Sequence, residues 1–268
     1  MEDIKGKKLF IFDIEGVLWN DTDDPQVVPQ APELVRELRD RGKKIHIITN
    51  ISRKTRRSIL DRLKRLNFNL ELEDISTAGD TAASYISSKL PQARCFLISE
   101  AGLAEELEAK GLRVVDEKPV DVVVVGSDRT LTYNRLNVAM RLVRGGAEFV
   151  CAGPTTVFRG TFRGDKGYFI GGGAICEAIR LASGVAPHYI GKPYPEIFQA
   201  ALKRWDLRAE EAVMVGDRYS IDVEGAKALG IASVLVSEED SLKPGDFVKK
   251  YAPDLVVRDL AELRCVLA

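Results

Sequence analysis

An apolar run that ends in two closely spaced carboxylates constrains the fold of this chain more than any other stretch. It lies within KKLFIFDIEGVL at residues 7–18, where Leu9 to Phe12 predict a short buried strand and Asp13, Glu15 and Gly16 follow. A strand that stops in acidic residues places them at the carboxyl edge of a sheet, where open α/β folds bind ligands. Two carboxylates held that close repel each other unless a cation or a proton intervenes. For this segment alone, a strand followed by a plain acidic turn explains the pattern as well.

Predicted strands and helices alternate along the rest of the chain. In the first and last parts we expect strands at 43–49, 212–215, 232–236 and 255–257, and helices at 32–41, 53–66, 195–205, 222–229 and 259–266. The middle, about 77–188, alternates too, with strands at 95–98, 120–125 and 148–152, helices at 101–110, 134–144 and 174–183, and Gly-rich loops near 160–173. This order predicts a doubly wound, mostly parallel α/β core, with the middle forming an inserted α/β domain.

Composition limits the classes of partner. The 268 residues carry a formal net charge of −1 with acids and bases interspersed, which does not indicate a nucleic-acid tail or a membrane-binding face. No apolar run has membrane-spanning length, and the start, MEDIKGKKLF, lacks the apolar middle of a signal peptide. The four cysteines form no CxxC pair, which is typical of free thiols in a reducing compartment. We therefore expect a cytoplasmic protein without nucleic-acid or membrane partners.

Three further segments place polar side chains at predicted strand ends. Thr49 and Asn50 end strand 43–49, Lys192 stands between Gly and Pro after a short apolar run, and Asp217 follows strand 212–215, with Asp222 five residues later. Each is weak evidence alone, and Asp222 is equally well explained as a helix N-cap. Together with the carboxylates after the first strand, they predict an oxygen-lined pocket for Mg²⁺ and a phosphoryl group.

The order of these segments resembles a known family. DxxGVL, hhhTN, GKP and GDRxxxD follow one another as do the four motifs of the haloacid dehalogenase superfamily of phosphatases. Finer features look like its NagD-like branch, which includes the p-nitrophenylphosphatases and phosphoglycolate phosphatases: TNISRKTR at 49–56, VVVVGSDRTLTYNRL at 122–136, GGGAICEAI at 171–179 and IGKPYPEIF at 190–198. The resemblance implies a Rossmann-like catalytic core at 1–76 and 190–268 and an inserted α/β cap at 77–189. The cap would close over the site, help to select a small-molecule phosphate ester, and mediate the homo-oligomerisation common in the branch.

The resemblance also implies roles for individual residues. Asp13 would be the nucleophile that forms an aspartyl-phosphate, and Glu15 would protonate the leaving group and then activate water. Thr49, the Asn50 backbone and Lys192 would hold the phosphoryl oxygens.

The metal set follows from the same resemblance. Mg²⁺ would be held by the Asp13 carboxylate, the backbone carbonyl of Glu15 and Asp217, with Asp222 in or near the shell.

Three departures from the family pattern qualify these roles. Glu15 stands where the usual acid/base is Asp, Ile51 stands where the branch has a second Asn, and residues 151–155 read CAGPT where the branch reads TNPD. The extra methylene of Glu15 moves its carboxyl group by about 1 Å, which can cost about a hundredfold in rate. A catalytically weakened protein that binds a phosphorylated ligand or a partner is therefore an alternative. A plain nucleotide-binding or receiver-like domain, with coincidental acidic edges, is a third.

Two motifs of the middle segment and its two connections to the core allow further predictions. Asp128 follows an apolar strand like Asp217, but it lacks the acidic follower and is assigned to the cap. Gly171–Gly173 miss the spacing of a dinucleotide site and predict close backbone packing at a helix start. We expect residues near 76–80 and 187–190 to act as hinges when the cap closes, because the insert leaves and re-enters the core there.

Overall fold

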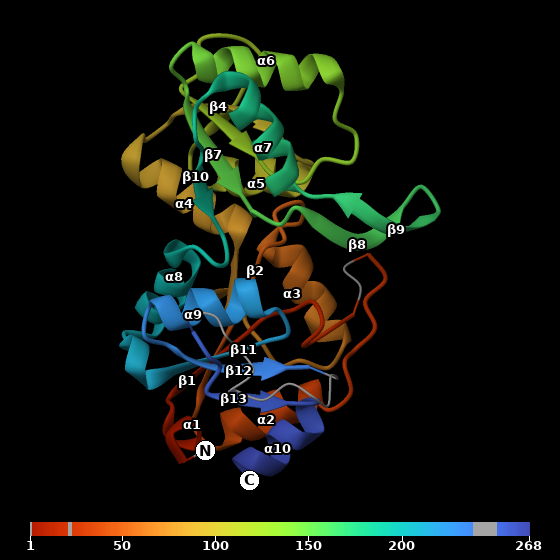
Figure 1. Cartoon of the computed structure of the whole chain (residues 1–268), viewed down its shortest axis with the longest axis vertical. Coiled ribbons are helices and arrows are strands. Elements are labelled where there is room, and N and C mark those ends of the chain that lie inside the picture. Colours follow the sequence, from red (N-terminus) through yellow and green to blue (C-terminus); the bar gives the residue numbers. More distant parts are fainter. Residues whose placement is uncertain (1, 21–22, 238–250) are drawn as a thin grey trace. The chain divides into compact units, whose positions relative to one another are not determined.

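The computed structural model describes residues 2–20, 23–237 and 251–268 and divides into two compact units (Figure 1). Unit 1 comprises Met1–Thr49, Leu60–Ser76 and Lys192–Ala268, and unit 2 comprises Asn50–Ile59 and Thr77–Gly191. The chain therefore passes from one unit to the other at four peptide bonds, those that follow Thr49, Ile59, Ser76 and Gly191.

Unit 1 is built on a six-stranded sheet of order β13-β12-β11-β1-β2-β3. Its strands are β1 (Leu9–Phe12), β2 (Lys44–Thr49), β3 (Ile75–Thr77), β11 (Ala212–Gly216), β12 (Ala232–Val236) and β13 (Leu255–Val257). β1 pairs in parallel with both β2 and β11, and β11, β12 and β13 continue in parallel. The strand order thus reverses between β1 and β11, and ligands of open α/β sheets bind outside the carboxyl ends of strands at such a point.

Helices cover both faces of the unit 1 sheet. One face carries α2 (Ala31–Asp40) and α10 (Leu260–Leu267), and the other carries α8 (Pro195–Trp205) and α9 (Glu224–Ala228) (Figure 1). All four residues of β1 are fully buried because the strand is central and covered on both faces, which explains its unbroken apolar sequence. In α8, Ile197, Phe198 and Ala201 pack on Ile11 and Met214 of the sheet. Short segments complete the unit: α1 (Glu2–Gly6), η1 (Leu72–Asp74), η2 (Ala209–Glu211) and η3 (Tyr219–Val223).

Unit 2 is a second α/β structure with a smaller sheet. Its parallel sheet has the order β10-β7-β6-β4-β5, from β4 (Arg94–Ile98), β5 (Arg113–Val114), β6 (Val122–Val125), β7 (Glu148–Ala152) and β10 (His188–Ile190). Side chains of α4 (Ala78–Lys89) and α5 (Ala101–Ala109) pack on one face, and those of α6 (Tyr133–Arg144) and α7 (Gly172–Ser183) on the other. Helix α3 (Arg56–Arg65) is divided, since its first residues cluster with unit 2 and the rest with unit 1.

The doubly wound α/β fold with a second α/β unit is confirmed, but the loop prediction for 160–173 is wrong. Residues 157–170 form an antiparallel hairpin, β8 (Val157–Phe162) and β9 (Asp165–Ile170), which extends from the end of β7 (Figure 1). Most hairpin residues are exposed or half-buried, so the strands lack the apolar alternation that marks a strand with one buried face. Among the described residues, no helix is both long enough and apolar enough to span a bilayer.

Close packing at the start of α7 is confirmed. A Cβ on Gly172 would lie 2.8 Å from the carbonyl carbon of Gly126, and one on Gly173 would overlap the Pro154 carbonyl. The triple glycine therefore lets this helix start approach two backbone segments. Asp128 lies in unit 2, as expected, where its carboxylate accepts hydrogen bonds from Thr130 N and Oγ1 at 2.8 and 2.7 Å.

Candidate active site

The ends of β1 and β11 bring Asp13 and Asp217 to the same edge of the unit 1 sheet. The two strands are parallel neighbours, and the register pairs Phe12 with Val215, so the residues after them emerge together. Asp13 continues the ladder, because its backbone N–H donates to the Val215 carbonyl at 3.0 Å. The carboxyl-edge placement predicted from sequence is therefore the observed one for both residues.

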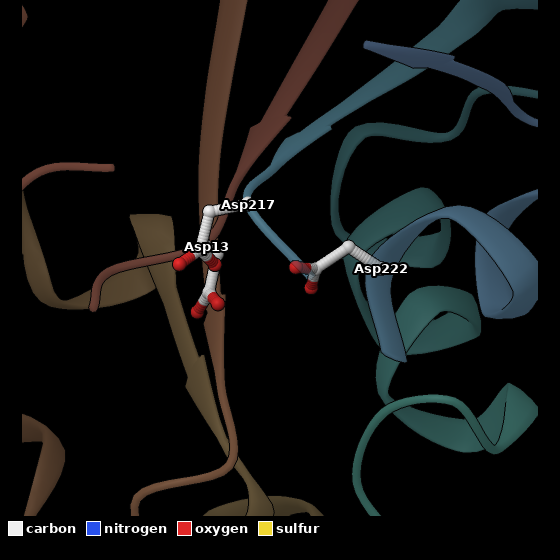
Figure 2. Close-up of side chains that lie close together, drawn as sticks. All are labelled: Asp13, Asp217 and Asp222. Carbon is white, nitrogen blue, oxygen red and sulfur yellow. The ribbon is translucent and has the colours of Figure 1, made fainter. Parts of the chain in front are cut away.

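A third carboxylate joins these two. Asp222 belongs to the π-helical segment η3, which starts two residues after Asp217. One oxygen from each of Asp13, Asp217 and Asp222 lies within 4.8 Å of the others. Figure 2 shows Asp13 and Asp217 close together and Asp222 pointing toward them from its helical turn. Helix formation begins earlier than the sequence predicts, at Tyr219 rather than 222, and this places Asp222 inside the turn and not at its N-cap.

Two glycines allow the carboxylates to come this close. A Cβ on Gly16, whose φ is +82°, would overlap the Asp217 carboxylate, and a Cβ on Gly216 would overlap that of Asp222. The glycine of each acidic motif is therefore required by space, and at Gly16 by backbone conformation as well.

Lys192 lies between two of the three carboxylates. Its Nζ is 2.7 Å from Asp13 Oδ1 and 2.7 Å from Asp222 Oδ1, and its side chain is only 1% exposed. A buried ammonium paired with two carboxylates replaces the lost hydration of all three groups. The sequence predicts that Lys192 holds phosphoryl oxygens, but not that it pairs with both Asp13 and Asp222.

Burial and mutual repulsion raise the pKa of two of these acids. Desolvation, followed by repulsion from Asp13 and Asp222, raises the pKa of Asp217 to about 7. Asp222 is fully buried, and this burial raises its pKa to about 6, although Lys192 acts in the opposite direction. Burial by itself lowers the pKa of Lys192, but Asp13 and Asp222 outweigh it and raise the value. When all three acids are ionised, the single positive charge of Lys192 does not balance them, and the cluster carries excess negative charge.

The site fits a hard divalent cation. Asp217 Oδ1 is buried and has no hydrogen-bond partner among the described residues. A buried carboxylate oxygen without a donor is unfavourable, and coordination of a cation removes that cost. Carboxylate oxygens are the ligands that Mg²⁺ prefers. A cavity of about 580 Å³ opens beside Gly16 and Asp217, and Asn20, Ser237 and Arg258 also line it.

Glu15 lies in a tight turn after Asp13. The Ile14 carbonyl accepts hydrogen bonds from Leu18 N at 2.8 Å and from Trp19 N at 3.0 Å, and Gly16 N donates to the Trp19 carbonyl at 2.8 Å. This turn fixes the Glu15 backbone, while its side chain stays half-buried. Ile14 N also donates to Asp13 Oδ1 at 2.6 Å, a contact that a sequence pattern cannot reveal because any residue except proline supplies a backbone N–H.

The two remaining candidates fall in different units. Thr49 ends β2, next to β1 in the sheet, and is 2% exposed. Asn50 follows it but clusters with unit 2, where its Nδ2 donates to Thr155 Oγ1 at 3.2 Å. Unit 1 therefore contains Asp13, Glu15, Thr49, Lys192, Asp217 and Asp222, and only Asn50 of the predicted set lies outside it.

Comparisons with known proteins agree with this geometry. The haloacid dehalogenase-like hydrolase family matches residues 10–113, and the HAD-hydrolase-like family matches residues 189–263. An acid sugar phosphatase of Staphylococcus aureus is 29% identical over 259 residues, which cover 97% of each chain.

Solved structures match along nearly the whole chain. A p-nitrophenyl phosphatase from Archaeoglobus fulgidus is 30% identical with a TM-score of 0.87, covering 97% of this chain and 99% of that one. NagD from Escherichia coli K-12 is 27% identical with a TM-score of 0.82, covering 96% and 98%. The chain therefore belongs to the haloacid dehalogenase-like hydrolases, in the NagD-like branch that contains the p-nitrophenyl phosphatases, and is an enzyme of their phosphatase class.

Proposed function

We propose that the chain is a Mg²⁺-dependent phosphatase that hydrolyses a small phosphomonoester through an aspartyl-phosphate on Asp13. One observation carries this proposal: Asp13 lies at a strand end within a group of three carboxylates, of which Asp13 and Asp222 are buried, and Lys192 pairs with these two. Such a group suits a cation and a phosphoryl group better than it suits a structural role, because the cluster by itself keeps excess negative charge out of water.

In the first half-reaction, an Asp13 oxygen attacks phosphorus in line with the ester oxygen. The bond from phosphorus to the ester oxygen breaks, and Glu15 donates its proton to the departing alcohol. The contacts of Asp13 Oδ1 with Lys192 and Ile14 N support this role, since they fix the orientation of the carboxylate before attack. The Thr49 hydroxyl, the Asn50 backbone N–H and Lys192 would hold the phosphoryl oxygens.

In the second half-reaction, the Glu15 carboxylate takes a proton from a water molecule that attacks the phosphorus of the acyl-phosphate. The bond from phosphorus to the Asp13 oxygen breaks, inorganic phosphate leaves, and both the Asp13 carboxylate and the protonated Glu15 are restored. Asp13, the Glu15 backbone carbonyl and Asp217 would bind Mg²⁺, with Asp222 in or near the shell. When bound, Mg²⁺ supplies the positive charge that offsets the carboxylates and the transferring phosphoryl group.

We assign the chemistry to unit 1, as the catalytic core, and substrate selection to unit 2, as the cap. The substrate class proposed is a small soluble phosphate ester, and the names of the relatives, acid sugar phosphatase and p-nitrophenyl phosphatase, support that class. Homo-oligomerisation through unit 2 stays a prediction from the family resemblance.

A second candidate function rests on Glu15. Asp is the usual acid/base at this position. The longer Glu leaves metal binding intact, because the proposed ligand here is a backbone carbonyl. The Glu side chain does, however, displace the carboxyl group that transfers protons. A protein that binds a phosphorylated ligand with little turnover would have this combination.

Hydrolysis of p-nitrophenyl phosphate with Mg²⁺ and with EDTA separates the two functions. Wild type should release phosphate only with Mg²⁺, and Asp13→Asn should abolish the release. Release that survives Asp13→Asn unchanged would refute the proposed nucleophile. If wild type is inactive but Glu15→Asp is active, the binding function is the correct one.

A further inference from the structure

Unit 2 brings together Asn50 and Gly191, the residues next in sequence to the proposed phosphate ligands Thr49 and Lys192. Asn50 is peptide-bonded to Thr49, and Gly191 is peptide-bonded to Lys192. A Cβ on Gly191 would lie 2.7 Å from Asn50 Oδ1, so the two residues are in direct contact. Gly191 has a φ of +120°, which no other residue type adopts readily, and its missing side chain makes room for the Asn50 amide group.

The loop that follows β7 holds both of these residues. Thr155 Oγ1 accepts a hydrogen bond from Asn50 Nδ2 at 3.2 Å. Gly153 N donates to the Ile190 carbonyl at 2.8 Å, and a Cβ on Gly153 would lie 2.5 Å from the Asn50 carbonyl oxygen. Residues 153–155 thus hold the chain just after Thr49 and just before Lys192.

The rest of the segment Asn50–Ile59 is also attached to unit 2. Arg56 N donates to the buried Glu106 Oε1 at 2.7 Å. A Cβ on Gly102 would lie 2.6 Å from the Cα atom of Lys54, so helix α5 packs directly on the segment backbone. Glu106 and Gly102 are both in α5, and this helix therefore fixes the segment independently of Thr155.

We propose that Thr155 is a positioning residue for the phosphate site. Through its hydrogen bond to Asn50, it fixes the backbone that follows Thr49 against Gly191, and so sets the spacing between Thr49 and Lys192. This inference rests on the proposed function, which gives those two residues the phosphoryl oxygens. The Asn50 backbone N–H, assigned to the same oxygens, would be oriented by the same contact.

Removal of the Thr155 hydroxyl should weaken phosphate binding and leave Mg²⁺ binding unchanged. Asp13, Asp217 and Asp222 follow β1 and β11, and neither Asn50 nor Gly191 adjoins them in sequence. Lys192 is also held by its ion pairs with Asp13 and Asp222. Loss of the Thr155 hydroxyl should therefore move Thr49 and the Asn50 backbone relative to Lys192, and leave the carboxylate cluster unchanged.

The test is calorimetric titration of inorganic phosphate at saturating Mg²⁺, and of Mg²⁺ alone, into wild type and three variants. Thr155→Val keeps the side-chain shape but cannot accept the hydrogen bond, Thr155→Ser keeps the hydroxyl, and Thr156→Val is a control at the adjacent exposed threonine. We expect Thr155→Val to raise the phosphate Kd about fivefold, the usual effect of losing one neutral hydrogen bond. The Mg²⁺ Kd should be unchanged, and Thr155→Ser and Thr156→Val should bind phosphate like wild type.

An unchanged phosphate Kd in Thr155→Val would overturn the proposal. Equal weakening of Mg²⁺ and phosphate would also overturn it, because it would make Thr155 a general structural residue. The readout needs no turnover: a wild type that binds phosphate but hydrolyses nothing refutes the proposed catalysis alone. A wild type that does not bind phosphate refutes both.

Discussion

Gly16 lies so close to the Asp217 carboxylate that the two positions, far apart in sequence, behave as one structural feature. A side chain on Gly16 would occupy the space of a carboxylate oxygen, and the φ of +82° already disfavours any residue other than glycine. The Asp217 carboxylate, which belongs to the fourth motif, thus requires a glycine at position 16 in the first motif.

Gly16→Ala should weaken Mg²⁺ binding, because the new Cβ displaces the Asp217 carboxylate from the cluster. Gly42→Ala is a matched control, since Gly42 has a similar φ of +76° but no atom lies within 4 Å of where its Cβ would be. Both variants should lose about 1 kcal/mol of unfolding free energy from backbone strain. Only Gly16→Ala should raise the Mg²⁺ Kd by about tenfold or more, measured by calorimetry. Equal Mg²⁺ affinities in the two variants would contradict this prediction.

Lys192→Met should destabilise the protein strongly at neutral pH. The change leaves Asp13 and Asp222 buried without their shared cation, and removal of one partner from a buried ion pair typically costs about 3–5 kcal/mol. The loss should be smaller at pH 5, because burial raises the pKa of Asp222 to about 6 and its protonation removes one of the two unpaired charges. Urea unfolding at both pH values measures it.

Lys64→Met provides the control for Lys192→Met. Lys64 forms an exposed ion pair with Glu71 at 3.4 Å, and such pairs contribute about 0–1 kcal/mol. A similar loss of stability in the two variants would show that the Lys192 pairing is not a buried one.

The stability of the metal-free protein should depend on pH through Asp217. Its pKa is raised to about 7 in the folded state from an ordinary value of 3.8, so the folded state holds a proton that the unfolded state releases. Between these two values the contribution of Asp217 to stability therefore falls as pH rises, and it stays constant above about pH 7. Saturating Mg²⁺ should remove the decline, because the cation favours the ionised carboxylate.

Asp217→Asn isolates this contribution from those of other titrating groups. In urea unfolding of the metal-free proteins at pH 5 and pH 7.5, wild type should lose more stability over the interval than Asp217→Asn. Parallel profiles for the two proteins would show that Asp217 titrates normally.

Glu15→Gln should lower kcat by about a hundredfold or more while leaving the Kd values of Mg²⁺ and phosphate unchanged. The amide cannot transfer a proton, but the proposed metal ligand at this position is the backbone carbonyl, which the turn from Ile14 to Trp19 holds in place. Steady-state kinetics and calorimetry test the two halves of the prediction. A parallel loss of Mg²⁺ affinity would place the Glu15 side chain in the metal site instead.

The local pattern of the sequence predicted the parts of the site that depend on strand ends. Asp13 and Asp217 follow short apolar strands, and such strands are buried in parallel sheets whose carboxyl ends share one edge. The hairpin at 157–170 escaped prediction because neither face of it is buried enough to impose an apolar alternation. The two crossings between units at 49/50 and 59/60 were missed as well, since the packing of Gly102 and Glu106 against that segment has no local signature.

The family, the doubly wound sheet and the order of the acidic motifs could therefore be read from the residues alone, because hydrophobic pattern and motif spacing are local properties of the chain. The pairing of Lys192 with both Asp13 and Asp222, and the hydrogen bond between Asn50 and Thr155, became visible only in the folded chain. These relationships depend on which side chains meet across distant segments, and on the burial that makes each contact strong.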